Sequence, residues 1–260
     1  MTDLHFNFVS PEVRLQFYTR LREEQLHAIL IGGDIGEAAS VTTFLAEIAD
    51  ALRIPIYFVL GNHDFYGGSI RLVREAVARE AEGSAWLHWL PDRGVVPLTA
   101  VTALIGHDSW ADGRLGSFFR SEVMLNDYFL IADLCGVGKE ELYAKLNTLG
   151  DEAARFLEKR ALEALPRYKN LIVLTHVPPF RDSCWHEGRI SDEDSLPHFA
   201  CRAVGDRLSR VMRAHPDRTM EVLCGHTHSA GFARILENLT VRTGSAEYGS
   251  PALQRVWDTE

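Results

Sequence analysis

Short runs of β-branched and apolar residues alternate with longer segments of helical spacing, and this alternation constrains the fold more than any other feature of the chain. Alternating strands and helices are typical of α/β domains, in which helices cover the faces of the sheets. We therefore expect an α/β domain with mixed sheets. The predicted strands are residues 28–31, 54–60, 101–105, 171–175, 220–224 and 239–243.

Several helices between these runs have recognisable starts. In the Ser-Pro-Glu sequence at residues 10–12, serine can cap a helix and proline fits its first position. Ser69 is expected to cap another helix that runs to about residue 82. Residues 139–165 form an apolar stripe at helical spacing, interrupted at Gly150, which predicts a long helix packed against the core.

The chain has 260 residues, of which 46% are hydrophobic, so it can bury a substantial core, and we expect one domain over residues 1–260. Its formal net charge of −9 argues against a general nucleic-acid-binding protein, because binding a polyphosphate backbone requires clustered lysine and arginine. The four cysteines lack the paired spacing of a zinc knuckle or a redox motif. We find no secretory pattern and no apolar run near the roughly 20 residues that span a bilayer. We therefore expect a soluble cytoplasmic protein that does not contact membranes.

Two segments follow no regular pattern: residues 107–138, rich in aromatics and glycine, and residues 178–202, rich in charge and proline. Long loops in compact domains are often functional, so both are candidate lid insertions. Their side chains could stack on a base and pair with a phosphate, or could equally form a packed lid. The side chains in question are Trp110, Arg114, Phe118, Phe119, Arg120, Tyr128, Arg181 and Arg189.

Almost every strand-like run ends in an oxygen- or nitrogen-bearing side chain that can bind a metal. Open α/β sheets place their ligand sites at the carboxyl ends of the strands, so residues far apart in the sequence can converge there. These residues are Asp3 and His5 in Asp-Leu-His, Asp34 in Gly-Asp, Asn62, His63 and Asp64 in Gly-Asn-His-Asp, His176 in Thr-His, and His226 and His228 in Gly-His-Thr-His.

The donor types suit divalent ions, and we expect two: Mn in the first place, with Fe, Zn or Ni as alternatives. A shared carboxylate can bridge two cations about 4 Å apart. Such a pair lowers the pKa of a bound water, polarises phosphoryl oxygens and stabilises charge on the attacking and leaving oxygens. Gly33, Gly61 and Gly225 are expected to permit the tight turns that direct the following side chains at the metals.

Each motif also has a simpler explanation when it is taken alone. Asp-x-His arises easily by chance, and Gly-Asp is usually a turn. Gly-Asn-His-Asp is more specific, and the two histidines of Gly-His-Thr-His have little reason to follow a buried strand unless they bind something. Five such motifs in this order favour a metal centre over coincidence.

In this order the motifs resemble those of the calcineurin-like metallophosphoesterase superfamily, and the match spans residues 3–228. The resemblance implies a four-layer α/β/β/α sandwich of two mixed sheets flanked by helices. It also implies hydrolysis of a phosphomonoester or small phosphodiester by attack of a metal-bound hydroxide. The implied ligands are Asp3, His5, Asp34 and His228 for one metal, with Asp34 bridging to a second metal held by Asn62, His176 and His226.

The resemblance further implies that His63 contacts the phosphate or the leaving group, and that Asp64 orients the His63 imidazole. Some subgroups fit less well: no tyrosine follows Gly-Asp as in the purple phosphatases, and Asp64 stands where protein Ser/Thr phosphatases have glutamate. His63 likewise stands where lipid A precursor hydrolases have arginine. The alternative is an inactive interaction scaffold of the same fold, which the complete ligand set disfavours.

Two features are left open. Only Met1 and Thr2 precede Asp3, where members of that superfamily usually have a longer apolar strand. Either the true start lies upstream, or Asp3 and His5 lie on a frayed terminus held mainly by metal, in which case the first metal should bind more weakly. His107 and Trp110 follow another apolar run, and we expect structural roles for them, with lining of the substrate pocket as the alternative.

Overall fold

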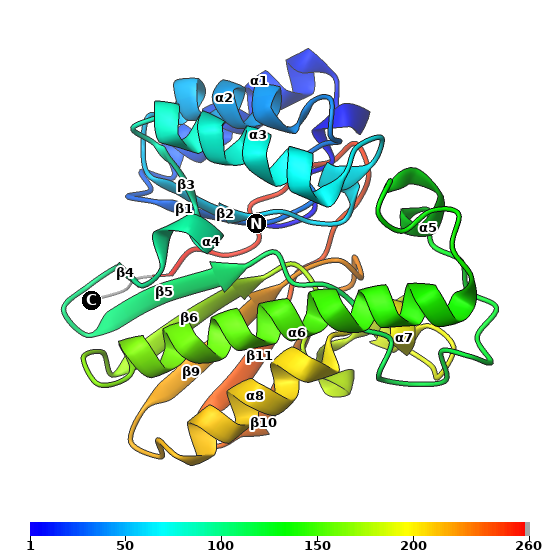
Figure 1. The fold of residues 1–260 in the computed structure, drawn as a ribbon. Helices are drawn as coiled ribbons and strands as arrows, with labels where there is room; N and C mark the ends of the chain where they lie inside the picture. The colour runs from blue at the N-terminus through cyan, green and yellow to red at the C-terminus, as the bar shows by residue number, and fades with distance from the viewer. Residues whose placement is uncertain (258–260) are drawn as a thin grey trace.

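The protein is described by a computed structural model over residues 1–257, in which two β-sheets lie face to face and helices cover their outer faces (Figure 1). One outer layer consists of α1 (Pro11–Glu23), α2 (Val41–Leu52) and α3 (Ile70–Gly83). The other contains α6 (Lys139–Ala164) and α8 (Arg202–Arg213). The predicted α/β/β/α sandwich is thereby confirmed. The extent of the domain over residues 1–260 stays a prediction.

The smaller sheet has three parallel strands in the order β1 (Ile29–Gly32), β2 (Ile56–Val59) and β3 (Leu87–Trp89). On the free side of β1, the amide of Gly32 donates to the carbonyl of Met1 at 2.9 Å, so the first residues of the chain run beside this strand. The sequence predicted β1 and β2 to within two residues at either end but did not predict β3, which is only three residues long.

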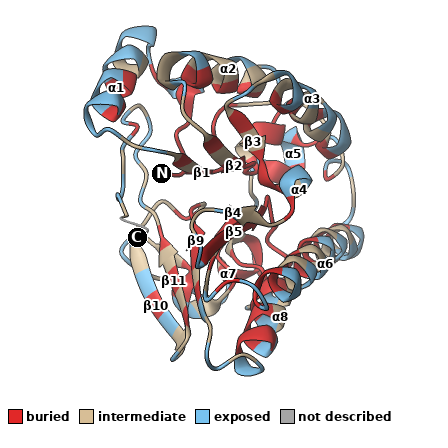
Figure 2. Ribbon diagram, turned by 90° about the vertical axis from the view of Figure 1, so that its left-hand side faces the viewer, coloured by how far each residue is buried: buried red, intermediate tan, exposed pale blue. Residues whose placement is uncertain are grey.

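The larger sheet has the strand order β10-β11-β9-β6-β5-β4. Its parallel centre consists of β5 (Thr102–His107), β6 (Asn170–Thr175), β9 (Thr219–Cys224) and β11 (Leu239–Thr243). The short β4 (Val96–Pro97) and β10 (Gly231–Leu236) are antiparallel edge strands. Figure 2 shows the contrast in burial: the central strands are largely buried, whereas most of β10 is intermediate or exposed.

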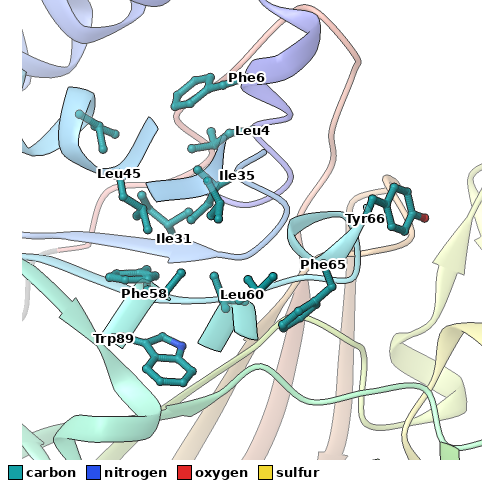
Figure 3. Close-up of a cluster of buried hydrophobic side chains, with 14 of the residues drawn as sticks. Leu4, Phe6, Ile31, Ile35, Leu45, Phe58, Leu60, Phe65, Tyr66 and Trp89 are labelled. Atoms are coloured by element: carbon teal, nitrogen blue, oxygen red, sulfur yellow. The ribbon is translucent and has the colours of Figure 1, made fainter. Parts of the chain in front are cut away.

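Three apolar cores hold the layers together. Between the sheets, Val59 and Leu90 pack with Leu104, Leu174 and Leu223 of the larger sheet. A second core joins the smaller sheet to α1–α3, and Figure 3 shows its side chains. The third lies between the larger sheet and helices α6 and α8. Burial of apolar surface on both faces explains why the central strands read as continuous apolar runs rather than alternating ones.

The predicted helix starts are confirmed. The Ser10 hydroxyl accepts the amide of Val13, and Ser69 accepts the amide of Leu72, each at 3.4 Å. Helix α6 continues through Gly150, which lies on its buried face. A Cβ atom at this position would collide with the side chain of Asp112, so the glycine allows a close approach of two segments.

The two irregular segments contain only short elements. Residues 107–138 include α5 (Asp127–Leu130), and residues 178–202 include η3 (Arg181–Ser183), the hairpin of β7 (Trp185–His186) and β8 (Arg189–Ile190), and α7 (Leu196–Phe199). The remaining short helices are η1 (Phe6–Phe8), η2 (His63–Phe65) and α4 (Leu90–Arg93). Within residues 1–257, no helix is both long and apolar enough to span a membrane.

Candidate metal centre

The predicted ligands lie just beyond the carboxyl ends of four parallel strands. Asp34 follows β1, Asn62 follows β2, His176 follows β6 and His226 follows β9. Because β1 and β2 belong to one sheet and β6 and β9 to the other, the ligands meet where the edges of the two sheets face each other. The strand-end argument from the sequence therefore holds across two sheets rather than one.

The amino-terminal segment brings Asp3 and His5 to the same place. Met1 to Phe6 are buried, and the backbone amides of Asp3 and His5 donate to the carbonyls of Gly33 and Asp34 at 2.9 Å each. The alternative of a frayed terminus is thus wrong: backbone hydrogen bonds to the loop after β1 and burial of the side chains order this segment.

One set of donors consists of Asp3, His5, Asp34 and His228, whose ligand atoms all lie within 4.8 Å of one another. His5 Nε2 is 3.1 Å from His228 Nε2 and 3.7 Å from Asp34 Oδ2. His228 Nε2 is 3.5 Å from Asp3 Oδ1. Two imidazole nitrogens and two carboxylates that converge in this way form a donor set suited to a divalent transition metal.

A second set adjoins the first through Asp34. The Asn62 Oδ1 atom is 3.0 Å from His176 Nε2 and 2.9 Å from His226 Nδ1. His176 Nε2 is in turn 3.4 Å from Asp34 Oδ1. Asp34 thus directs one carboxylate oxygen toward each set, which is the arrangement that a bridging ligand requires.

Further hydrogen bonds orient the ligand side chains. The His176 Nδ1 atom lies 2.8 Å from the Gly32 carbonyl, and His226 Nε2 lies 3.2 Å from the His198 carbonyl. A carbonyl can only accept, so a proton on each of these nitrogens would bond to it and leave the lone pair of the other ring nitrogen to bind a metal in the second set.

Backbone strain concentrates at this site. Nine non-glycine residues among residues 1–257 have positive φ, and five of them are predicted ligands: Asp3, His5, Asp34, His226 and His228. Residues other than glycine seldom adopt such angles, which cost free energy and persist where the surrounding structure enforces them.

The three glycines that precede predicted ligands are required for two different reasons. Gly33 has φ +91° and supplies an unusual turn as predicted. Gly61 and Gly225 are required by close contact instead, because a Cβ atom would overlap the Asp34 side chain at Gly61 and the Thr2 and Asp3 side chains at Gly225.

The electrostatics of the cluster fit a site built for cations. Burial lowers the pKa values of His5 and His226 to about 3 and also lowers that of His176, so these imidazoles are neutral and their lone pairs are free to bind metal. Burial and the nearby carboxylates of Asp3 and Asp64 raise the pKa of Asp34. Within residues 1–257, neither Asp3 nor Asp34 forms an ion pair with lysine or arginine. Buried carboxylates need a counter-charge, and metal cations would supply it.

His63 lies beside the cluster, but its predicted partner does not contact it. Its ring centroid is 4.6 Å from that of His5 and 4.3 Å from that of Tyr66, and its backbone amide donates to Asp34 Oδ1 at 2.9 Å. Burial, followed by the effect of His176, lowers the pKa of His63 to about 4.

The expectation that Asp64 orients His63 is wrong. One carboxylate oxygen of Asp64 accepts the amides of Ile35 and Gly36, and the other accepts that of Gly61. Asp64 therefore joins the loop after β1 to the loop after β2. The ring stacked on His63 belongs to Tyr66.

The alternative that His107 or Trp110 lines the substrate pocket has no support in their contacts. His107 is buried against Phe156, and Trp110 is buried against Phe65. The arginines of the irregular segments are partly occupied as well: Arg114 pairs with Asp112 and Asp151, and Arg181 pairs with Glu193.

Two aromatic residues near the cluster were missed by the sequence argument. The ring of Tyr248 is 4.5 Å from that of His5 and 5.2 Å from that of His228, and half of the residue is exposed. Phe199 packs 5.6 Å from His226. Neither lies in a recognisable motif, so nothing in the sequence marked them.

Comparison with known proteins gives a family and a fold. The family model described as calcineurin-like phosphoesterase matches residues 1–230. No curated protein matches the sequence significantly. Among solved structures, a phosphopantetheinyl hydrolase from Mycobacterium tuberculosis matches with TM-score 0.65 and 13% identity over 96% of this chain and 88% of that one.

Two further structures share the fold. A dimetal phosphatase from Danio rerio matches with TM-score 0.56 and 16% identity over 90% of this chain and 77% of that one. GAP50, the anchor in the inner membrane complex of Plasmodium, matches with TM-score 0.54 and 14% identity over 98% of this chain and 74% of that one. At these identities the likeness concerns the fold.

Proposed function

The chain belongs to the calcineurin-like phosphoesterase family, and from this premise we propose that it hydrolyses phosphate esters at a centre of two divalent metal ions. One observation supports the proposal above all others: two donor sets, drawn from five segments of the chain, share the carboxylate of Asp34. A structural role would not require so many buried carboxylate and imidazole groups at one point.

The proposed assignment gives each ligand to one set. Asp3, His5 and His228 would hold the first ion, Asn62, His176 and His226 would hold the second, and Asp34 would bridge them. Bound there, two cations would lower the pKa of a water and neutralise charge on a phosphoryl group. Ions with mixed nitrogen and oxygen preference fit this donor set, and we propose Mn, with Fe, Zn or Ni as alternatives.

The groups around the cluster support a small phosphate ester as substrate. His63 is partly exposed beside the first donor set, where it could donate a hydrogen bond to a phosphoryl or leaving-group oxygen. The half-exposed rings of Phe8 and Tyr248 pack together 5.0 Å apart at the same place and could contact an apolar or planar leaving group. We propose phosphomonoesters and small phosphodiesters as the substrate class.

The first test combines metal analysis with hydrolysis of bis-p-nitrophenyl phosphate and p-nitrophenyl phosphate in excess Mn. We expect two metal ions per chain and turnover of at least one of the two esters. Asp34→Asn should lose metal at both positions and nearly all activity, because one oxygen of the bridging carboxylate serves each set. Retention of two metals and a tenth of the activity would remove Asp34 from this role.

The same measurements separate the enzyme from an inactive scaffold of this fold. A scaffold would bind fewer than one metal per chain and would hydrolyse neither ester. The presence of every expected ligand within the cluster favours the enzyme.

A further inference from the structure

We propose that Asp127, which lies outside every recognised motif, is a positioning residue that turns the Asn62 carboxamide so that its oxygen faces the second metal. Asp127 begins α5, in the segment that the sequence suggested as a lid. The inference rests on the proposed function, since it assigns a task to a residue that supports one of the proposed ligands.

The geometry places an acceptor behind the ligand. The Asn62 Nδ2 atom donates to Asp127 Oδ1 at 2.8 Å, while Asn62 Oδ1 points to the rings of His176 and His226. The Tyr66 hydroxyl donates to the same Asp127 oxygen at 2.7 Å and lies 3.3 Å from Asn62 Nδ2. Figure 3 shows the hydroxyl of Tyr66 pointing away from the apolar cluster around Phe65.

A carboxamide has one end that can bind a metal and one that cannot. Its oxygen carries lone pairs, whereas its NH₂ group only donates. A turn of the Asn62 amide by 180° would direct its oxygen at the Asp127 carboxylate and its NH₂ group at the metal position. Two acceptors would then face each other at Asp127, and the NH₂ group would face the bound cation without a lone pair to offer it, so both contacts would be unfavourable. Asp127 therefore selects the binding orientation.

Hydrogen bonds join the segment that contains Asp127 to the residues that follow the Asn62 loop. The Gly67 amide donates to the Leu130 carbonyl, and the Ala132 amide donates to the Gly68 carbonyl, each at 2.9 Å. The Asp133 carboxylate accepts the amide of Ile70 at 2.7 Å. These bonds make residues 127–133 a fixed support rather than a free lid.

Tyr128, the residue after Asp127, supports His226, another proposed ligand of the second metal, through His198. The Tyr128 hydroxyl lies 2.6 Å from His198 Nδ1, and the His198 carbonyl accepts from His226 Nε2 at 3.2 Å. Two consecutive residues of α5 thus support two ligands of the second metal, Asn62 directly and His226 through His198. We therefore expect loss of Asp127 to weaken the second metal selectively.

The test titrates metal-free protein with MnCl₂ alone by isothermal titration calorimetry, so that no substrate is involved. Loss of a group that supports a metal ligand typically weakens metal affinity about 10- to 100-fold. We expect Asp127→Leu to weaken one of the two Mn sites by this factor and to leave the other within about threefold. Asp127→Asn keeps the shape and an acceptor oxygen, so it should recover part of the loss, and it serves as the informative variant if Asp127→Leu does not fold.

Two controls separate positioning from general stability. Glu47→Ala removes a carboxylate that pairs with Arg14 between α1 and α2, outside the donor cluster, so it should lower the melting temperature without changing either Mn affinity. In an Asn62→Ala background, Asp127→Leu should add no further loss, because the group that it orients is gone.

The results can contradict the inference in three ways. Unchanged Mn affinities in both Asp127 variants would overturn it, as would equal weakening of both sites or a loss that persists in the Asn62→Ala background. Wild-type protein that binds fewer than two Mn would overturn the proposed function as well. Two Mn in the wild type with no effect of Asp127 would overturn this inference alone.

Discussion

Several residues of the candidate metal centre have a strained backbone or an uncharged imidazole. Asp34 and His228 adopt left-handed backbone angles that turns normally reserve for glycine or asparagine. The imidazoles of His5 and His226 remain uncharged because burial lowers their pKa values. Such costs are typical of functional sites, where the surrounding structure holds groups in the conformation that the chemistry needs.

At this scale the role of His63 can be tested by changing the leaving group. General acid catalysis contributes typically about 10²- to 10⁴-fold, and most where the leaving group is strongly basic. If His63 is the acid, His63→Gln should keep both metals, lose much kcat/KM toward an alkyl phosphate ester and lose distinctly less toward the p-nitrophenyl ester.

The comparison uses kcat/KM for both esters in wild type and variant, with metal content measured in parallel. Equal losses for the two esters would show that His63 stabilises charge on the phosphoryl oxygens instead. Loss of metal would identify it as a ligand.

At the scale of elements, the loops after β1 and β2 are held together by one buried side chain. Asp64 accepts three backbone amides, two from the loop that contains Asp34 and one from the loop that contains Asn62. Asp64 therefore sets the distance between Asp34, the proposed bridging ligand, and the second donor set, although the resemblance assigned it to His63.

Asp64→Ala should consequently destabilise the protein and loosen both metal sites. Each buried donor left unsatisfied costs about 1–3 kcal/mol, so the free energy of unfolding in urea should fall by at least that amount. The loss of kcat/KM should be similar for alkyl and p-nitrophenyl esters. If kcat/KM fell only for the alkyl ester and the free energy of unfolding were unchanged, Asp64 would act through His63 after all.

His107, the last residue of β5, should make the free energy of unfolding depend on pH. His107 is buried near Asp108, Arg74 and Glu152, and burial lowers its pKa to about 4, against 6.5 for an ordinary histidine. Between these pH values the unfolded chain binds the proton and the folded chain does not. Stability contributed by neutral His107 is therefore present above pH 6.5 and is lost as the pH falls toward 4, by about 1.4 kcal/mol per pH unit.

His107→Asn should flatten this slope, because asparagine can still accept the Ser109 amide that bonds to His107 Nδ1 but does not titrate. The measurement is urea unfolding of metal-free wild type and variant between pH 4.5 and 7 in EDTA. Subtracting the two curves removes the titration of the other histidines. Parallel curves would show that folding does not lower the pKa of His107.

At the scale of the whole molecule, the candidate metal centre lies where the two sheets meet, and its proposed ligands come from both. Asp34 and Asn62 follow strands of the smaller sheet, and His176 and His226 follow strands of the larger one. Metal ions bound there would tie the two halves of the sandwich together, so their free energy of binding should appear as stability of the fold.

Removal of metal should therefore lower the melting temperature strongly. A ligand at 100 times its dissociation constant stabilises the folded state by about 2.7 kcal/mol per site. For a chain of this size, 1 kcal/mol shifts the melting temperature by about 2–4 °C, so two sites predict a shift of at least about 10 °C. Calorimetric scans with Mn and with EDTA measure it. Coincident scans would show that the ions do not link the two sheets.

The sequence by itself determined six of the strands and the main helix starts, and it named the candidate donors. Apolar runs buried on both faces are legible without a structure, and so are turns that end in Gly-Asn-His-Asp or Gly-His-Thr-His. Only the tertiary structure decided what surrounds those donors. Asp127 accepts a hydrogen bond from Asn62, which lies 65 positions earlier in the sequence. The ring of Tyr248, near the carboxyl terminus, packs against that of His5, near the amino terminus. Such contacts depend on how layers pack, and single side chains without a local motif carry no signal of their distant partners.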